Sequence, residues 1–235
     1  MKKSLSFPLT ILFGVAVFFF ILSFSIGLPI YCRFFYYLHI NALDLPKITG
    51  YDYATIKEAY NQVLNYLTLP GFEFGAGVFK FSEEGAAHFA DCKVLFNINL
   101  IALILSSAII VATLILQKKN IVELKRPFGY SVAFTSAVSV LAIIVLLFGI
   151  VSINFEKAFV IFHKIFFAGK DNWTFDPRYD QIINVLPQEF FMNCAIFIGV
   201  GIIALSVGII VFQIVAKKLK NKKIEKTSEN SLTND

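Results

Sequence analysis

The sequence predicts an all-α membrane protein in which four transmembrane helices carry a small extracytoplasmic α+β cap. Of its residues, 57% are hydrophobic and only 16% are charged, whereas a soluble domain usually has about 25% charged residues. The charges are also unevenly placed, because four long stretches of the chain contain none. This composition excludes a soluble enzyme, a disordered chain and a collagen-like protein.

Each of the four uncharged stretches is long enough to span a bilayer. A hydrocarbon core about 30 Å thick needs roughly 20 apolar residues at 1.5 Å per helical residue, and the stretches contain 29, 24, 29 and 27 residues. We expect the first helix within residues 1–32 and the others at 94–117, 127–155 and 190–216. The first stretch resembles a signal peptide, but no small-x-small cleavage site follows it, so we expect this helix to stay attached.

The distribution of lysine and arginine predicts the orientation in the membrane. With a cytoplasmic amino terminus, the inner segments 1–6, 118–126 and 217–235 hold twelve Lys and Arg against four acidic residues. The outer segments 33–93 and 156–189 hold nine against twelve. We therefore expect both termini in the cytoplasm and any active site on the outer face. The basic tail suits anionic lipid rather than nucleic acid.

The two outer segments contain 61 and 34 residues, which is marginal for an independent core, so we expect them to pack together as the cap. Residues 51–67 have the spacing of an amphipathic helix. Residues 72–81 alternate in part and contain glycine, which predicts one or two short strands. Ser82 is typical of an N-cap, with Glu83 and Glu84 in the first turn, and this helix should run unbroken into the second span.

Two of the three histidines should project from helices just above the bilayer. His88 lies six residues before Val94, which corresponds to roughly 9 Å of helix. Residues 154–167 continue the helical spacing of the third span, and His163 would lie roughly 12 Å beyond its end. The ester bonds of lipids lie at about this level, so both side chains could reach them.

A histidine with a pKa near 6.5 is suited to general acid–base chemistry. Glu84, His88 and Asp91 fall on one helical face, so a carboxylate could orient the ring. An interfacial histidine is also often only a polar group at the membrane edge, and that alternative stays open for both residues. His39 follows a run of aromatic residues at the end of the first span, which favours a structural role.

Other chemistry has weaker support. A zinc site built from His88, Glu84 and His163 would lack the usual ligand spacing, so we expect no metal. A Cys–His pair of His88 with Cys92 is possible, although simple packing of the thiol is the alternative. The spans contain no acidic or basic residue, which argues against an ion channel or proton-coupled transporter. We expect three free thiols, at Cys32, Cys92 and Cys194.

Two stretches of the sequence carry a resemblance to a known family. Residues 81–96 read Phe-Ser-Glu-Glu-Gly-Ala-Ala-His-Phe-Ala-Asp-Cys-Lys-Val-Leu-Phe, and residues 172–191 begin Asn-Trp-Thr-Phe-Asp-Pro-Arg-Tyr-Asp. Together they resemble the signatures that precede the second and last spans in a family of bacterial four-helix membrane proteins. That family includes the lipoprotein intramolecular transacylases, and the similarity covers essentially the whole chain.

The resemblance implies an acyltransferase of the bacterial cell membrane that needs no cofactor. Its substrate would be a diacylglyceryl-modified lipoprotein surrounded by membrane phospholipid, and it would move the sn-2 acyl chain to the amine of the N-terminal cysteine. His88 would be the general base and His163 the partner acid or oxyanion donor, although the two roles could be exchanged. The supporting and substrate-binding residues would be Asp91, Glu84, Trp173, Asp176 and Arg178.

Two other classes of function stay open at this point. The first is a non-catalytic membrane protein that binds lipid or holds a partner complex, which the uncharged spans allow. The second is a metal-dependent membrane hydrolase.

Overall fold

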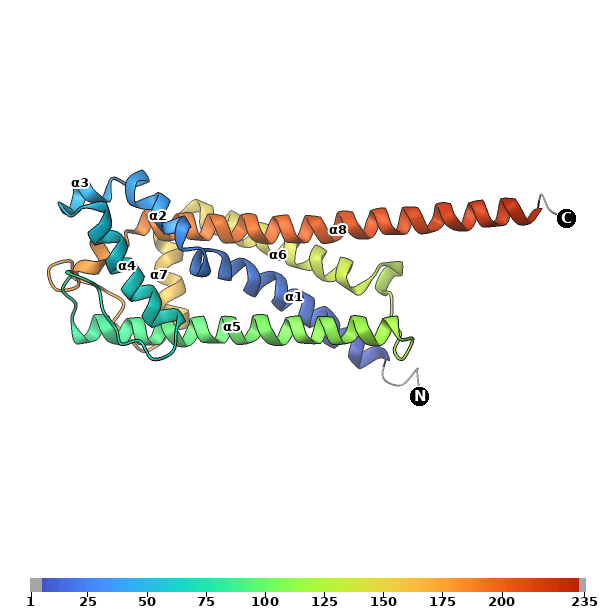
Figure 1. The fold of residues 1–235 in the computed structure, drawn as a ribbon, viewed down its shortest axis with the longest axis horizontal. Coiled ribbons are helices and arrows are strands. Elements are labelled where there is room, and N and C mark those ends of the chain that lie inside the picture. Colours follow the sequence, from blue (N-terminus) through green and yellow to red (C-terminus); the bar gives the residue numbers. More distant parts are fainter. Residues whose placement is uncertain (1–5, 233–235) are drawn as a thin grey trace. The chain divides into compact units, whose positions relative to one another are not determined.

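The computed structural model describes residues 6–232, apart from the side chains of 128, 150–152 and 223–232, and these residues are mostly helical (Figure 1). The long helices are α1 (Ser6–Tyr31), α5 (Glu83–Lys118), α6 (Val132–Ile153) and α8 (Gln188–Leu232). The shorter elements are α2 (Arg33–Ala42), α3 (Leu45–Thr49), α4 (Tyr53–Thr68), α7 (Phe155–Phe166) and two 3₁₀ turns, η1 (Pro127–Gly129) and η2 (Gln181–Asn184).

Four helices are long and apolar enough to cross a membrane, which confirms the four predicted spans. Their mean hydropathy lies between 2.5 and 2.8 over the most apolar part of each helix. In a bilayer every backbone N–H and C=O must be bonded within the protein, so an apolar segment of this length is stable there as a helix. These four helices are Ser6–Tyr31, Glu83–Lys118, Val132–Gly149 and Gln188–Lys222. In the second of them the uncharged run that can lie in the membrane begins only after Lys93.

The chain forms two compact units. The first unit contains the described residues of 1–22, 105–145 and 201–235, and the second contains 23–104 and 146–200. All four long helices therefore contribute to both units.

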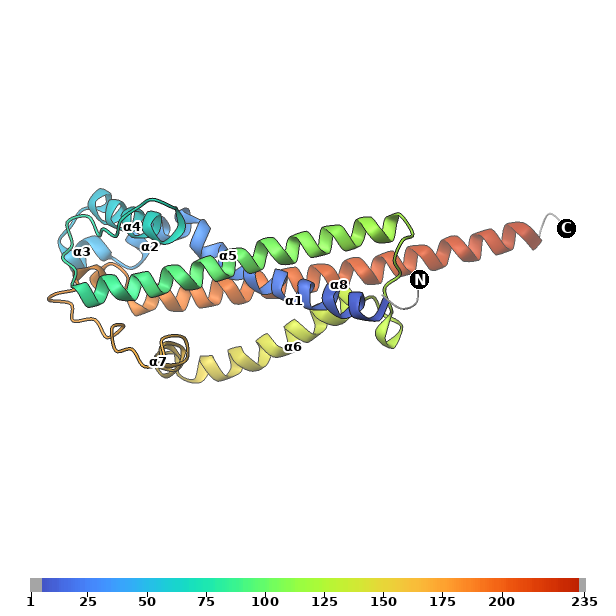
Figure 2. The same ribbon diagram turned by 90° about the horizontal axis from the view of Figure 1, so that it is seen from below.

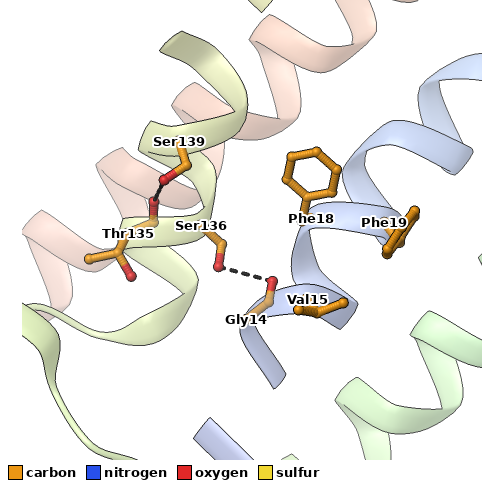
Figure 3. A pocket seen from close by; sticks show the side chains of 7 residues that line it. All are labelled: Gly14, Val15, Phe18, Phe19, Thr135, Ser136 and Ser139. Atoms are coloured by element: carbon orange, nitrogen blue, oxygen red, sulfur yellow. Dashed lines mark hydrogen bonds between the residues drawn. The ribbon is translucent and has the colours of Figure 1, made fainter. Parts of the chain in front are cut away.

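In the first unit, small and hydroxyl side chains bring α1 and α6 together. The Ser136 hydroxyl donates to the carbonyl oxygen of Gly14 at 3.0 Å, and a side chain at Gly14 would come within 3.0 Å of Val132. Small residues of this kind allow membrane helices to approach closely. A pocket of about 300 Å³ lies beside this contact, and Figure 3 shows the side chains that line it. It is lined by Gly14, Val15, Phe18, Phe19, Thr135, Ser136 and Ser139.

In the second unit, residues 33–82 and 154–187, which we call the cap, share one hydrophobic core with the adjoining helix ends. The Tyr36 ring stacks on Tyr60 with centroids 3.8 Å apart, and its hydroxyl donates to the carbonyl oxygen of Val185 at 2.7 Å. Helix α4 buries the apolar face that its spacing predicts. The two halves of the cap are therefore joined by both apolar packing and hydrogen bonds.

The predicted strands at residues 72–81 are wrong, because the described residues contain no β-strand and this segment is a loop. Gly71 and Gly77 have positive φ angles of 79° and 60°, which interrupt an extended backbone. The backbone N–H groups of Gly77 and Lys80 donate to the side chains of Gln62 and Gln181, at 2.9 and 3.0 Å, instead of to a neighbouring strand. The partial alternation in sequence reflects apolar side chains, such as Phe79, that a loop buries in the cap core.

The helix expected over residues 154–167 is present as α7, but its expected continuity with the third span is wrong, because the helix breaks at Asn154. This residue is extended, with φ −158°, and its side chain accepts a hydrogen bond from the backbone of Lys157 at 2.8 Å, so it caps the new helix α7. Figure 1 shows α7 running across the part of α5 in the same unit, and Figure 2 shows α7 nearly end-on. His163 therefore lies beside α5 instead of rising above the third span.

Candidate active site

The start of α5 is fixed by a carboxylate from the other half of the cap. Ser82 caps the helix as predicted, since its hydroxyl accepts from the backbone of Gly85 at 2.9 Å. Asp180 is buried and accepts from both the backbone N–H and the hydroxyl of Ser82, at 2.8 and 2.9 Å. A side chain at Gly85 would collide with this carboxylate. The first turn of α5, one turn before His88, is therefore held in place by Asp180, the residue that precedes η2.

His88 from α5 and His163 from α7 meet in the second unit. Their ring centroids are 5.8 Å apart and the planes are inclined by 28°. Both residues are buried, with exposed fractions of 6% and 7%. The structure thus places the two predicted histidines side by side although 75 positions separate them in the sequence.

Aromatic rings surround the pair. Phe167 lies 4.7 Å from His88 and 5.6 Å from His163, measured between ring centroids. Phe175 lies 5.4 Å from His88, and Trp173 lies 4.9 Å from His163. These side chains remove water from both rings, which strengthens any electrostatic interaction within the site.

The two imidazole rings are held by different partners. Nδ1 of His163 lies 2.7 Å from the carbonyl oxygen of Phe159, and because a carbonyl only accepts, this nitrogen carries the proton and Nε2 holds the lone pair. Nε2 of His88 lies 3.4 Å from the sulfur of Cys92. Burial raises the pKa of the Cys92 thiol to about 12, so the thiol is protonated at neutral pH and is not an activated nucleophile.

Burial also keeps both histidines uncharged at neutral pH. His88 lies in residues 83–93, which precede the uncharged run of α5. The pKa of His88 is lowered to about 4, chiefly by burial, and the nearby His163 contributes in the same direction. Asp91 and Asn172 oppose this lowering. Burial likewise lowers the pKa of His163 below its ordinary value, against a raising effect of its bond to Phe159. Each ring can therefore accept a proton, and neither is the charged imidazolium at the outset.

The predicted supporting carboxylates do not bond directly to His88. Asp91 accepts from the Lys170 ammonium at 2.5 Å and from the Asn172 amide at 3.0 Å. The hydrogen bond from Lys170 holds the pKa of Asp91 below its ordinary value. Glu84 is exposed, and no hydrogen bond joins it to either histidine in the part of the chain that the structure describes.

The predicted substrate-binding residues divide into two places. Trp173 belongs to the aromatic surroundings of His163, and its indole N–H donates to the carbonyl oxygen of Lys170 at 3.0 Å. Asp176 and Arg178 form an exposed ion pair with each other at 2.6 Å, in a turn where the backbone N–H of Tyr179 donates to the carbonyl oxygen of Asp176. His39 donates to the carbonyl oxygen of Phe35 at 2.7 Å, as the structural interpretation expects.

Sequence reasoning missed several residues around the histidines. Lys170 and Asn172 bond to Asp91 across about 80 positions of sequence, and Phe167 and Phe175 complete the aromatic surroundings. The only signal was that Asn172 stands beside Trp173 in the second signature. Nothing in the local pattern indicates which side chain it contacts.

The structure also bears on the alternatives. Among the side chains that the structure describes, no three His, Cys, Asp or Glu residues are grouped so that they could hold a metal ion. Cys32, Cys92 and Cys194 are free thiols, as expected.

Comparisons with known proteins agree with this architecture. A family model described as lipoprotein intramolecular transacylase Lit matches residues 11–191, while no curated protein sequence gives a significant match. Among solved structures, the in meso structure of Lit from Bacillus cereus matches with a TM-score of 0.80 and 26% sequence identity, covering 94% of this chain and 98% of that chain.

Two further structures of the Bacillus cereus protein each carry a substitution of one histidine. The variant with arginine matches with a TM-score of 0.77 over 93% of this chain and 95% of that chain. The variant with alanine matches with 0.74 over 92% and 96%, and both are 25% identical to this sequence. The family model covers most of the chain, and the structures share its whole fold. The protein described here is thus a multi-pass membrane protein that belongs to the lipoprotein intramolecular transacylase family.

Proposed function

We propose that this protein transfers the sn-2 acyl chain of a diacylglyceryl-modified lipoprotein to the amine of the same lipoprotein's N-terminal cysteine. The product is an N-acylated lipoprotein that keeps one acyl chain on its glyceryl group. The observation that carries the proposal is the meeting of two buried histidine rings, from separate segments of the chain, in a member of this family.

The reaction exchanges an ester for an amide within one substrate molecule. The cysteine amine attacks the sn-2 carbonyl carbon, a C–N bond forms, and the C–O bond to glycerol breaks. One proton must leave the nitrogen and one must reach the departing glycerol oxygen, so no cofactor is consumed. A positioned histidine can perform both proton transfers.

The uncharged state of both rings supports a relay of a single proton. We assign His88 as the base that accepts the proton from the attacking amine. Because the pKa of His163 is also lowered by burial, this ring is not charged beforehand. The proton that leaves with the glycerol oxygen is therefore the one taken from the amine, passed on by His88 itself or through His163. The dry aromatic surroundings favour this transfer over hydrolysis, because water would compete with the amine.

Mass spectrometry of lipoprotein N-terminal peptides tests the proposal. We expect N-acyl, mono-acylglyceryl peptides from cells that express the protein and diacylglyceryl peptides with a free amine from cells that lack it. A peptide that loses one acyl chain and keeps a free amine would indicate a hydrolase. Unchanged peptides would indicate the non-catalytic lipid-binding or scaffolding role.

We further propose that the cap faces the outside of the cell and that both termini lie in the cytoplasm. Lysine and arginine exceed acidic residues in segments 1–6, 118–126 and 217–235, at the ends of the spans away from the cap, and this excess supports the orientation. Single cysteines should therefore react with a membrane-impermeant reagent applied from outside when placed at Gly50 or Asp171, but not at Asn120. The background would be a variant without native cysteines. Labelling only at Asn120 would contradict the orientation.

A further inference from the structure

A chain of polar contacts lies behind His88 and ends in an amide. The carboxylate of Asp91 uses one oxygen to accept from Lys170 at 2.5 Å and the other to accept from the side-chain nitrogen of Asn172 at 3.0 Å. The ion pair and the amide are thus joined through one carboxylate. Because the nitrogen of Asn172 is committed to Asp91, the orientation of the amide is fixed and its oxygen is turned away from the carboxylate.

Two buried polar atoms beside these contacts could form a donor and acceptor pair. Nδ1 of His88 and Oδ1 of Asn172 are both buried, and neither has a hydrogen-bond partner among the described residues. The two side chains are neighbours, since Asn172 bonds to Asp91, which lies one helical turn after His88 on the same face of α5. Buried polar groups are nearly always hydrogen-bonded in native proteins. One is an amide oxygen that only accepts, and the other is a nitrogen that donates when protonated.

We infer that Asn172, held in place by Asp91 and Lys170, is a positioning residue that keeps His88 in the tautomer with the proton on Nδ1. The inference rests on the proposed function, in which His88 is the base. With the proton on Nδ1, the lone pair is on Nε2, the nitrogen that lies beside the Cys92 thiol. Nε2 is then the atom that accepts the proton from the substrate amine.

The same series of polar contacts also supports the charged state of His88 during the reaction. When Nε2 takes a proton, the hydrogen bond from Nδ1 to Asn172 becomes charge-assisted and therefore stronger. Asp91, the carboxylate to which Asn172 bonds, carries a negative charge that favours the cationic form of His88. Lys170 and His163 oppose the cationic form. Cys92, protonated on the other side of the ring, adds no charge at neutral pH.

His163 provides an internal comparison. Its Nδ1 proton is fixed by the backbone carbonyl of Phe159, a contact that no side-chain substitution of Asn172 removes. A change at Asn172 should therefore disturb the tautomer of His88 and leave that of His163 intact. This difference separates a positioning role from a general loosening of the site.

The test combines three variants of the full-length membrane protein with two measurements. Asn172→Ala removes the acceptor, and Asn172→Asp keeps an acceptor oxygen while adding a negative charge. Asp171→Asn changes the exposed neighbour in the same loop and serves as the control. The measurements are the initial rate on a diacylglyceryl lipopeptide and ¹⁵N NMR of labelled histidine, which distinguishes a protonated Nδ1 from a protonated Nε2.

We expect Asn172→Ala to lower kcat by about 10- to 100-fold, a part of the usual effect of acid–base catalysis, with little change in KM. A fraction of His88 should then carry its proton on Nε2. Asn172→Asp should keep the Nδ1 proton and raise the pKa of His88, so the acid limb of activity moves to higher pH. Asp171→Asn should match the wild type in both measurements.

An Asn172→Ala protein with wild-type kcat and a fully protonated Nδ1 on His88 would overturn the inference. The same holds if Asn172→Ala and Asn172→Asp lose activity equally and leave the tautomer unchanged. The NMR measurement does not depend on the reaction, so these results are distinguishable from failure of the proposed function. That failure would show as a wild-type protein that forms no N-acyl product from the lipopeptide, whatever the tautomer of His88.

Discussion

The two compact units hold their helices together in different ways. In the first unit, α1 and α6 touch through small and hydroxyl side chains such as Gly14 and Ser136. In the second, aromatic stacking and bonds between distant residues, such as Ser82 with Asp180, join the segments. Every described histidine or carboxylate that is buried lies in the second unit. The first unit is thus a membrane scaffold, and the second holds the groups that can do chemistry.

The largest expected loss of activity comes from removing the buried histidines of the second unit. His88→Ala and His163→Ala should each lower acyl transfer by about 10²- to 10⁴-fold, because each removes a group that handles the proton. Initial rates on a diacylglyceryl lipopeptide measure this. His39→Ala is the matched control, since it removes a partly buried cap histidine that bonds only to the backbone of its own helix. It should retain most of the activity.

The same experiment needs a check on folding. Melting temperatures of the purified variants should stay close to that of the wild type. If His39→Ala were as inactive as His88→Ala at an unchanged melting temperature, the assignment of the site to His88 and His163 would fail.

A pair of glycine substitutions compares the packing of the units directly. At Gly85→Ala the new methyl group collides with the Asp180 carboxylate, so the bonds that fix the start of α5 must break. We expect a loss of about 1–3 kcal/mol in the free energy of unfolding, together with lower activity. At Gly14→Ala the nearest atoms are side-chain tips of Val132 and Ser136, at 3.0 and 3.3 Å, which can shift.

Thermal unfolding in detergent measures both variants. We expect Gly14→Ala to unfold within a few degrees of the wild type and to keep its activity. A larger loss of stability at Gly14 than at Gly85 would reverse the proposed division between a scaffold in the first unit and precisely fixed helix ends in the second.

A smaller effect should appear in the pH dependence of kcat/KM. A base must be uncharged, and the pKa of His88 is lowered to about 4 by burial, so the histidine limb falls toward pH 4 instead of near 6.5. Between pH 8 and 6 the profile should follow only the substrate amine, whose ordinary pKa is about 8. A second acid limb centred near 6.5 would show that His88 is more hydrated in the working enzyme than its burial implies.

The elements of the fold differ in how far the sequence predicts them. The four spans are predictable because a bilayer leaves an uncharged run of this length no alternative to a helix. Helix α4 is predictable because Ile56, Tyr60 and Val63 recur on one face. The loop containing Gly71 and Gly77 was wrongly assigned to strands, because alternation describes burial and does not by itself distinguish a sheet from a loop.

The site is only partly predictable for a related reason. Chemical type and membrane depth select His88 and His163, but their meeting depends on the break at Asn154 that turns α7 across the second unit. Asp91 was chosen as a direct partner of His88 from helical spacing, whereas the structure gives it to Lys170 and Asn172. A single sequence contains no local signal for contacts between residues about 80 positions apart.

The most direct test of the account is a double-mutant cycle on the two histidines. The initial rate of N-acyl product formation is measured for the wild type, His88→Ala, His163→Ala and the double variant, on the same lipopeptide. Residues that act as one catalytic unit are strongly non-additive. The account predicts that the double variant is hardly slower than either single variant. Losses that multiply, with the double variant slower by the product of the two single effects, would show two independent roles and contradict the single site.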